Sequence, residues 1–370
     1  MKISVERHIL SEVITHLSRV ASPKSSLPVL EGIFVSAENN MLTLISYNLE
    51  MGMKKQIPAK VYEEGKIVIS ARIFGEIVRK MVEPFVDITV DDRNMCHFES
   101  GKTVFDIMGS SAEDYPQVPE INQNKGIKLP ASLFKNMVNQ TIFSVAGENT
   151  QKPILKGSLF EIDPAYITVV SVDGFRMSIR KEKLESGLNE NVVIPGRLLS
   201  EIVRIINEES ENIEIYISQN HIMVRAEEYD IISRLLEGEF INYKNSIPQN
   251  FHSTILIKTK EMIDVIERIS LLISEQIKTP IRCIIEKEKM IFSCASALGR
   301  GTDSCDIELN GEEFEIGFNS RFLLEALKAI EDEEVVLNFN GPFSPMLIQP
   351  VENDAFSYMI MPMRLNTEVK

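Results

Sequence analysis

The chain has 370 residues, 44% of them hydrophobic and 25% charged, which is typical of a globular protein and excludes wholesale disorder. Its formal net charge is −15, it has four scattered cysteines, and no apolar run approaches the roughly 18–20 residues of a membrane span. These features exclude a disulfide-rich scaffold and a helical membrane protein. They favour a protein of the reducing cytoplasm with two to four domains, at roughly 100–200 residues per domain.

Helix-like and strand-like segments repeat three times along the chain. Each third opens with a predicted helix and then a proline; the helices cover 5–20, 130–145 and 259–274, and the prolines are Pro28, Pro153 and Pro280. A second predicted helix follows between two alternating, strand-like runs, at 71–82, 195–206 and 320–331. Its first arginine recurs 125 and then 124 residues later, as Arg72, Arg197 and Arg321.

Two polar, proline-bearing stretches separate the thirds, at 116–126 and 247–250. We therefore predict an α+β fold of three tandem copies of one domain, each with two helices packed on antiparallel sheet. The predicted domains are 1–123, 124–251 and 252–370.

The second helix of each copy has two distinct faces. Its apolar residues form one stripe, and the charged residues lie on the other side, as Arg72, Glu76, Arg79 and Lys80 in the first copy and Arg197, Glu201 and Arg204 in the second. One interpretation is a solvated face with weak arginine–glutamate pairs. The other is a surface that lies against phosphates of a nucleic-acid duplex without reading its base sequence.

The charge distribution favours the second interpretation. The six predicted helices together carry a formal charge of +3, which leaves −18 on the rest of the chain. His8 and His16 lie two turns apart on the first helix and would add to a positive face at lower pH.

No catalytic or metal-binding motif is complete. Residues 100–103 (Ser-Gly-Lys-Thr) resemble the end of a phosphate-binding loop, but the surrounding residues indicate a hairpin. Asp91, Asp92 and Asp173 are candidate carboxylates for acid–base chemistry, although Asp173-Gly174 is more typical of a turn between strands.

Three cysteines recur every 11 residues, as Cys283, Cys294 and Cys305. This spacing is too wide for zinc ligand pairs and indicates buried thiols on neighbouring strands. We predict no metal, no cofactor and no enzymatic activity.

The residues Tyr358–Leu365 are rich in methionine. They form either an adaptable apolar surface for several partners or a last core strand. The residues alone leave both alternatives open.

Six segments, in a fixed order along the whole chain, resemble the bacterial sliding clamps, the beta subunits of DNA polymerase III; they are residues 1–7, 27–30, 155–161, 173–177, 316–319 and 361–365. The resemblance implies a DNA clamp fold and a head-to-tail homodimer that closes into a ring around double-stranded DNA. It also implies as partners the clamp loader, replicative and repair DNA polymerases and other proteins with a clamp-binding motif, but no membrane.

The resemblance also implies three sets of site residues. The DNA-facing residues match Lys24, Arg72, Arg79, Lys80, Arg197 and Arg204. The dimer interface matches Phe105 and Ile107 on one side and Leu272 and Ile273 on the other. The partner-peptide pocket matches Leu155, Val172, Gly174, Phe175, Arg176, Met177, Ile241, Asn245, Ser246, Pro345, Met359, Ile360, Met361, Pro362, Met363, Arg364 and Leu365.

Four features depart from the commonest pattern of that family. Phe175 stands where histidine is frequent, Val172 where threonine is frequent, Asn245 where a basic residue is known, and residues 366–370 extend beyond the end of some members. These departures affect the preference for peptides more than the presence of the pocket.

Three functions are compatible with the residues. The first is a non-catalytic processivity clamp that an ATP-driven loader opens in trans. The second is a hydrolytic enzyme that uses Asp91, Asp92 or Asp173. The third is a repeat scaffold that binds only proteins. The threefold repeat and the charged helix faces favour the first.

Overall fold

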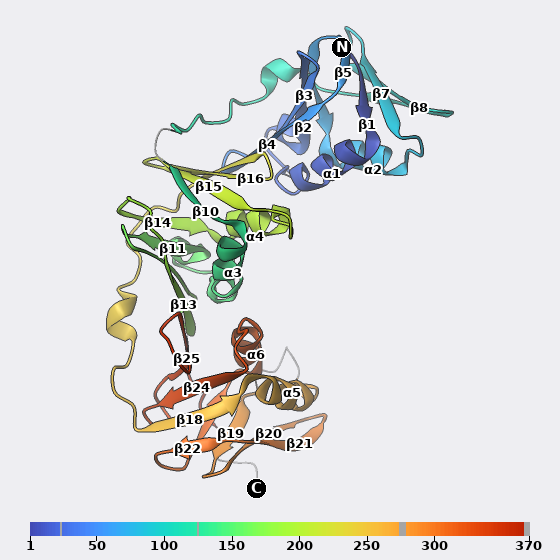
Figure 1. Cartoon of the computed structure of the whole chain (residues 1–370). Helices are drawn as coiled ribbons and strands as arrows, with labels where there is room; N and C mark the ends of the chain where they lie inside the picture. Colours follow the sequence, from blue (N-terminus) through green and yellow to red (C-terminus); the bar gives the residue numbers. More distant parts are fainter. Residues whose placement is uncertain (23, 124–125, 274–278, 366–370) are drawn as a thin grey trace. The chain divides into compact units, whose positions relative to one another are not determined.

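The computed structural model describes residues 1–22, 24–123, 126–273 and 279–365 (Figure 1). The tail 366–370, part of the first linker (124–125) and the end of the helix predicted at 259–274 lie outside the described residues. Two compact units are present, one made of Met1–Phe134 and Arg197–Leu235, the other of Lys135–Gly196 and the residues from Leu236 onward. The predicted domain boundaries remain a prediction.

The first unit contains two antiparallel sheets. One has the strand order β5 (Lys60–Glu63), β1 (Lys2–Glu6), β7 (Phe85–Val90), β8 (Met95–Ser100) and β9 (Thr103–Met108). The other has the order β10 (Gly126–Pro130), β15 (Asn212–Ile217), β16 (His221–Ala226), β17 (Tyr229–Arg234), β4 (Met51–Pro58), β3 (Met41–Tyr47), β2 (Gly32–Glu38) and β6 (Gly65–Ser70).

The second unit also contains two antiparallel sheets. The larger has the order β14 (Glu190–Pro195), β11 (Gly157–Ile162), β12 (Tyr166–Val172), β13 (Arg176–Lys183), β26 (Phe356–Ile360), β25 (Met346–Pro350), β24 (Glu334–Phe339), β18 (Ser253–Lys258) and β22 (Glu308–Asn310). The smaller has the order β21 (Gly299–Asp306), β20 (Lys289–Ser296), β19 (Ile281–Ile285) and β23 (Phe314–Phe318).

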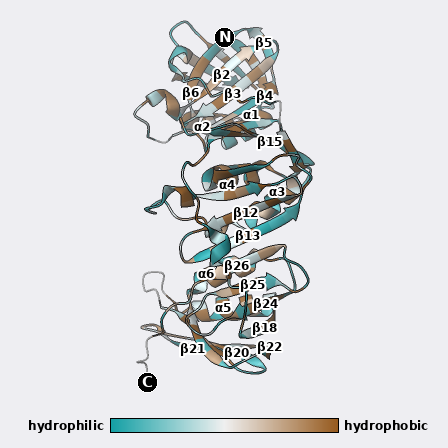
Figure 2. Cartoon of the chain, turned by 90° about the vertical axis from the view of Figure 1, so that its left-hand side faces the viewer, coloured by the Kyte–Doolittle hydropathy of each residue, from teal (hydrophilic) through white to brown (hydrophobic). Residues whose placement is uncertain are grey.

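The helices cover the sheets with their apolar stripes. They are α1 (Arg7–Leu17), α2 (Ala71–Lys80), α3 (Ala131–Asn139), α4 (Gly196–Ile205), α5 (Thr259–Ser270) and α6 (Ser320–Lys328). In α2, Phe74, Ile77 and Val78 are buried, and the charged residues lie on the exposed side as predicted. The small residue Gly75 lets α1 approach, because a Cβ there would lie 3.3 Å from Ile14 Cγ2. Strands in Figure 2 carry both brown and teal residues, as alternation between a buried and an exposed face requires.

Several predicted boundaries and one repeated landmark are wrong. The helices predicted at 5–20, 259–274 and 320–331 end earlier, at Leu17, Ser270 and Lys328. The first helix begins at Arg7, not residue 5, because Ile3 and Val5 alternate with polar residues in β1. The helix predicted at 130–145 ends at Asn139 and is followed by a short 3-10 turn. Pro280 does not repeat Pro28 and Pro153: those two begin 3-10 helices, whereas Pro280 directly precedes β19.

The two predicted turns are confirmed. Residues 100–103 join β8 to β9 in a hairpin, with Gly101 at a φ of 61°. Gly174, at a φ of 92°, lies between β12 and β13, and Asp173 Oδ1 accepts hydrogen bonds from the backbone N–H groups of Phe175 and Arg176. Positive φ angles favour glycine, which explains both residues.

Asp91, one of the two other candidate carboxylates, also has a structural role. Asp91 Oδ1 accepts hydrogen bonds from the backbone N–H groups of Arg93 and Met95, so this carboxylate shapes a turn.

Within the described residues, no group of three or more histidine, cysteine or carboxylate side chains is arranged to hold a metal ion. Among the same residues, no helix has the length and apolar character needed to cross a membrane.

All four cysteines are buried free thiols, and three of them lie on the adjacent strands β19, β20 and β21, as their spacing predicts. Burial raises the pKa of Cys96 to about 11 and that of Cys305 to about 12. Because the thiolate is the reactive form, we expect an aromatic disulfide reagent to label the native protein very slowly and all four thiols in denaturant. Rapid labelling of the native protein would contradict this assignment.

Candidate functional sites

The predicted DNA-facing residues of the first repeat lie on the surface. Arg72, Arg79 and Lys80 are exposed on α2, and Lys24 is exposed in the loop after α1. Arg72 pairs with Glu76 at 3.3 Å, a contact in which both side chains are more than half exposed. Such a pair contributes at most about 1 kcal/mol to stability, so both groups are available to other partners.

The predicted DNA-facing residues of the second repeat, Arg197 and Arg204, also lie on the surface. Arg197 is exposed, and its Nη2 donates to the carbonyl oxygen of Arg19 at 2.9 Å. Arg204 is also exposed and pairs with Glu201. Glu201 is buried rather than on the solvent side, and it lies close enough to His16, near the end of α1, to affect the pKa of that imidazole.

His16 does not belong to a solvated positive face. Its ring packs edge-on against Tyr229, with 5.5 Å between the centroids, and its Nδ1 has no hydrogen-bond partner in the structure. Burial lowers the pKa of His16 below the ordinary 6.5, and Arg19 lowers it further, against the opposing effects of Glu12 and Glu201. The imidazole is therefore neutral near pH 7.

The lowered pKa of His16 predicts a loss of stability in mild acid. Below pH 6.5 the unfolded chain binds a proton that the folded chain binds only at lower pH, so the free energy of unfolding falls. For one group this slope is at most about 1.4 kcal/mol per pH unit. We expect His16→Gln to flatten the pH dependence of urea unfolding between pH 7.5 and 5.5. Equal slopes in this variant and in the unsubstituted protein would contradict the prediction.

Five of the predicted peptide-pocket residues meet in one apolar cluster of the second unit. Leu155, Val172 and Met177 are buried in it, and Ile241 and Met359 are partly buried against it. They come from five separate segments. Met177 in β13 lies opposite both Val172 in β12 and Met359 in β26, which brings three of these segments together. The sheet thus places residues nearly 200 positions apart side by side.

The other pocket residues surround this cluster or lie apart from it. Phe175 is 64% exposed, and its carbonyl oxygen accepts a hydrogen bond from the N–H of Met361 at 2.8 Å. Ile360 is buried in the other large core of the unit, and a Cβ on Gly317 would lie 2.6 Å from Leu365 Cδ2. The remaining members are half-buried or exposed; they are Asn245, Ser246, Pro345, Pro362, Met363 and Arg364.

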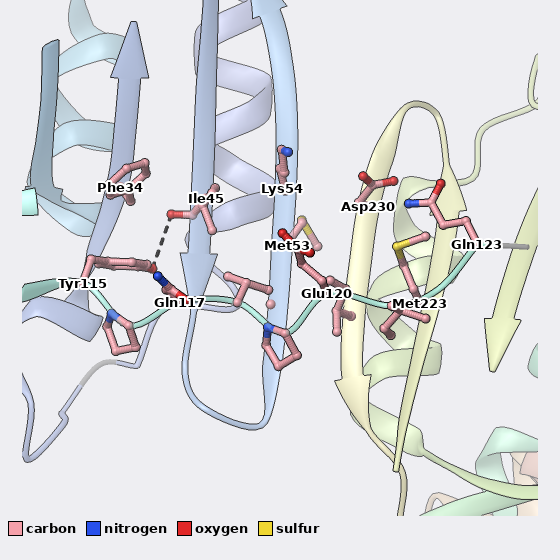
Figure 3. Close-up of a pocket in the computed structure, with 16 residues that line it drawn as sticks. Phe34, Ile45, Met53, Lys54, Tyr115, Gln117, Glu120, Gln123, Met223 and Asp230 are labelled. Carbon is pink, nitrogen blue, oxygen red and sulfur yellow. Dashed lines mark hydrogen bonds between the residues drawn. The ribbon is translucent and has the colours of Figure 1, made fainter. Parts of the chain in front are cut away.

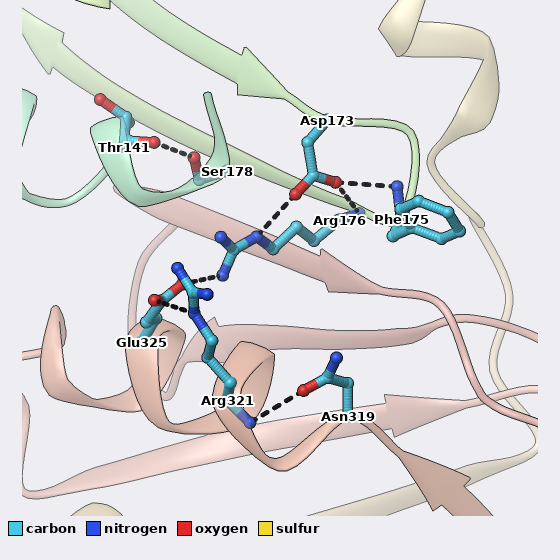
Figure 4. A network of polar contacts seen from close by, with 8 residues as sticks. All are labelled: Thr141, Asp173, Phe175, Arg176, Ser178, Asn319, Arg321 and Glu325. Atoms are coloured by element: carbon cyan, nitrogen blue, oxygen red, sulfur yellow. Dashed lines mark hydrogen bonds and ion pairs between the residues drawn. The ribbon is translucent and has the colours of Figure 1, made fainter. Parts of the chain in front are cut away.

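Arg176 lies in a buried polar network beside the apolar cluster (Figure 4). Its side chain is only 6% exposed; Nε donates to Asp173 Oδ2 at 3.0 Å, and Nη1 donates to Glu325. The guanidinium also lies over the ring of Phe322, 4.4 Å from its centroid. Phe175 stacks on the same ring at 6.4 Å. Arg176 thus ties β13 to α6.

The network includes residues that sequence reasoning did not assign to the site, namely Glu325 and Phe322. Burial raises the pKa of Glu325, but hydrogen bonds from Arg321 and Arg176 outweigh it and hold the pKa below its ordinary value. The repeat offered a signal for Glu325, since Glu76 and Glu201 occupy the same position in α2 and α4. Nothing in the sequence indicated that its partner would be Arg176.

The predicted interface residues lie beside two sheet edges. Phe105 and Ile107 are on β9, the last strand of its sheet, and both remain partly exposed. Leu272 and Ile273 follow α5, and a Cβ on Gly301 of the edge strand β21 would lie 3.1 Å from Leu272 Cδ1. An edge strand with adjacent apolar side chains is suited to pairing with another chain.

A cavity of about 950 Å³ lies in the first unit between residues 115–123 and the eight-stranded sheet (Figure 3). Val118 and Ile121 of this predicted linker pack against Met223 and Ile232. Figure 3 shows the segment crossing from β4 to β17, and Tyr115 Oη donates to the carbonyl oxygen of Ile45 at 3.4 Å. The linker therefore braces the junction between these two strands.

Known proteins match the chain from end to end. Models of the N-terminal, central and C-terminal domains of the DNA polymerase III beta subunit match residues 1–119, 128–242 and 244–364. A beta sliding clamp of Halalkalibacterium halodurans is 29% identical over 98% of this chain and its own full length.

Solved structures show the same similarity. A DNA polymerase sliding clamp from Bacillus subtilis covers 99% of this chain and 100% of its own, with 29% identity and a TM-score of 0.95. A DNA polymerase III beta chain from Streptococcus pneumoniae covers 98% and 100%, with 26% identity and a TM-score of 0.92.

Fold and similarity together define a clamp protein assembled from three like α+β domains, as the sequence predicts. The chain belongs to the DNA polymerase III beta subunit family, the sliding clamps of bacterial DNA replication.

Proposed function

We propose that two copies of this chain form a head-to-tail ring that encircles double-stranded DNA and keeps polymerases on it without catalysing a reaction. The observation that carries the proposal is the recurrence of two exposed cations on the second helix of every repeat. They are Arg72 and Arg79, Arg197 and Arg204, and Arg321 and Lys328.

The proposed contact with DNA is electrostatic and independent of sequence. Arginine and lysine neutralise phosphates, and affinity of this kind falls steeply with added salt. Tryptophan is absent from the chain, so stacking of bases on its indole rings does not occur. The residues outside the predicted helices carry a formal charge of −18, which disfavours contact of DNA with the rest of the molecule relative to the cationic helix faces. Weak contacts inside a closed ring permit sliding, and the ring itself prevents escape.

The apolar cluster around Leu155, Val172 and Met177 supports the proposed binding of polymerases. It lies next to the exposed Phe175 and Met361 in the second unit. An apolar site of this kind anchors one or two side chains of a short peptide. We assign to it the peptides of the clamp loader, of replicative and repair polymerases and of other clamp-binding proteins. The proposal places the chain with the DNA in the cytoplasm.

Topological retention is the experiment that tests this function. The protein is loaded onto nicked circular DNA by a bacterial clamp loader with ATP and then separated from free protein by gel filtration. We expect it to remain on the circle at high salt and to leave when one restriction cut linearises the DNA. Retention on linear DNA with free ends would contradict the ring.

A charge-reversed variant tests the role of the helices. We expect Arg72→Glu, Arg197→Glu and Arg321→Glu combined to reduce loading without changing the oligomeric mass. Unchanged loading would instead favour a scaffold that binds only proteins. A metal-dependent hydrolysis that disappears in Asp173→Asn would favour the enzyme.

A further inference from the structure

We propose that the cavity beside residues 115–123 binds an extended peptide of a partner protein, in which an acidic residue stands within two positions of a large apolar side chain. The cavity lies wholly in the first unit, apart from the apolar cluster around Leu155, Val172 and Met177. The inference therefore needs neither the ring nor the DNA of the proposed function.

The cavity has the same place in the first unit that the apolar cluster has in the second. Gly52 lies opposite Ile232, just as Met177 lies opposite Met359, and Gly52 and Met177 are 125 residues apart, like the first two repeats. The adjacent rows of opposed residues correspond in the same way; they are Phe34, Ile45 and Lys54 in the first unit and Leu159, Val170 and Ile179 in the second. The five positions line the cavity in the first unit and belong to the apolar cluster in the second.

The second unit fills this position with its own chain, and the first unit does not. Five apolar side chains from residues 236–247 pack on the cluster of the second unit; they are Leu236, Phe240, Ile241, Tyr243 and Ile247. In the first unit, Val118 and Ile121 pack on Met223 and Ile232 but leave a cavity of about 950 Å³, a volume typical of ligand sites.

Apolar residues on the floor of the cavity are incompletely covered. Phe34 and Ile45 are partly exposed, whereas their counterparts in the second unit, Leu159 and Val170, are buried. Burying such a surface under an apolar side chain is favourable, because it removes apolar area from water. The floor is therefore suited to one large apolar side chain of a partner.

Gly52 keeps this space open. A Cβ at this residue would lie 3.1 Å from Tyr47 Cδ2 and 3.2 Å from Val118 Cγ1, so a longer side chain would enter the space beneath the crossing segment. The counterpart of Gly52 in the second unit is Met177, which is buried in the apolar cluster. Gly52→Met is thus a substitution that the second repeat itself suggests for filling the cavity.

Free backbone groups beside the cavity favour a peptide over a small molecule. Four N–H groups of the crossing segment make no hydrogen bond within the described residues; they belong to Gln117, Val118, Glu120 and Ile121. Pro116 and Pro119 restrict the residues before them to extended backbone. An extended segment with free N–H groups is suited to strand addition, in which main-chain hydrogen bonds hold a peptide and pockets select its side chains.

Charge at the cavity selects an acidic residue. Lys54 lies opposite Asp230 in the sheet (Figure 3), but Asp230 Oδ1 already accepts a hydrogen bond from Arg225 Nε at 2.7 Å. Lys54 is half-buried and has no ion-pair partner among the described residues. Glu120 is exposed, where water screens its charge. Because Ile45 lies opposite Lys54, a peptide carboxylate bound to Lys54 is close to a side chain bound on the apolar floor.

Peptide selection on the full-length protein tests the inference. A phage library of random short peptides is selected on the immobilised protein, and synthetic copies of the selected peptides are measured by fluorescence anisotropy. We expect one class with aspartate or glutamate within two positions of a large apolar residue. Lys54→Glu should weaken binding of this class about tenfold, and Gly52→Met should abolish it. Lys60→Glu, at an exposed lysine of the other sheet in the first unit, should leave it unchanged.

Peptides that bind the apolar cluster of the second unit provide the folding control. Their affinity should fall in Phe175→Ala and should be the same in Gly52→Met as in the unsubstituted protein. Lys54→Glu changes a partly exposed side chain without filling the cavity, so it tests the site even if Gly52→Met does not fold.

Amide hydrogen exchange locates the bound peptide. A selected peptide of the expected class should slow exchange of residues 117–121 in the unsubstituted protein, and the same concentration should not do so in Lys54→Glu. Exchange that slows without peptide as the protein concentration rises would show that a second copy occupies the cavity, and would overturn the assignment to a partner.

The outcomes separate this inference from the proposed function. If every selected peptide loses affinity in Phe175→Ala and none in Gly52→Met, the inference is wrong and the proposed function stands. Loss in Gly52→Met without loss in Lys54→Glu would overturn the assignment of an acidic peptide. Peptides that bind Phe175→Ala and Gly52→Met as tightly as the unsubstituted protein would overturn both peptide sites.

Discussion

Replacement of Arg176 with alanine is expected to lower the free energy of unfolding by about 3 kcal/mol, the lower end of the range for breaking a buried ion pair. Without the guanidinium, Asp173 and Glu325 keep their charges but lose its hydrogen bonds. The contact with the ring of Phe322 is lost as well. Urea unfolding followed by circular dichroism measures the difference.

Arg321 supplies the matched control, since it donates to the same carboxylate, Glu325, at 2.7 Å but is 71% exposed. Arg321→Ala should cost less than about 1 kcal/mol, because water replaces an exposed partner. The loss of free energy of unfolding in Arg176→Lys should lie between those of the two alanine variants. Lysine keeps the charge but lacks the planar guanidinium group that donates to two carboxylates at once. Similar losses from Arg176→Ala and Arg321→Ala would show that burial does not decide the strength of this network.

The second large effect is expected from Phe105→Arg, which should convert the proposed dimer to monomer at micromolar concentration. Loss of a central aromatic anchor typically costs about 2 kcal/mol or more, which is roughly thirtyfold in the dissociation constant, and a buried unpaired charge adds to it. Sedimentation equilibrium measures the mass. Retention on circular DNA should disappear in the same variant, because a ring that does not close does not enclose the DNA.

Phe85→Arg is the control for Phe105→Arg. Phe85 is a phenylalanine of the same sheet, on β7, and is 53% exposed compared with 39% for Phe105. The proposed interface does not include it, so the variant should keep the dimeric mass and the retention on DNA. Loss of the dimer in both variants would show that the sheet as a whole tolerates no charge, and a dimeric Phe105→Arg would contradict the interface.

Local patterns predicted the elements well where neighbouring residues decide the structure. The apolar stripe of α2 is recognisable because helix neighbours recur every three to four residues, and Asp173-Gly174 is recognisable because a turn needs a positive φ. The predicted start of α1 was wrong for a related reason. Ile3 and Val5 fit either a helix or an alternating strand, and pairing with β7, more than 80 residues away, selects the strand.

Environments that depend on distant segments were not predictable in the same way. The three equivalent glutamates have similar local sequences, yet the side chain of Glu76 is 59% exposed, that of Glu201 7% and that of Glu325 31%. Glu201 packs near the end of α1, and Glu325 meets Arg176 of β13. The peptide-pocket residues were named through family resemblance, since spacing alone would not bring Leu155 beside Met359.

By itself, the sequence determined that this protein is one α+β domain written three times, with a cation pair on the same helix in each copy. Those features follow from the spacing of apolar and charged residues that are close in the sequence and from the recurrence of that spacing in each third of the chain. Only the tertiary structure decided that Arg176 is buried between two carboxylates and that β9 and β21 are the strands left at the edges. Strand pairing and burial depend on segments hundreds of residues apart, and the free energy of a charge depends on what those segments place around it.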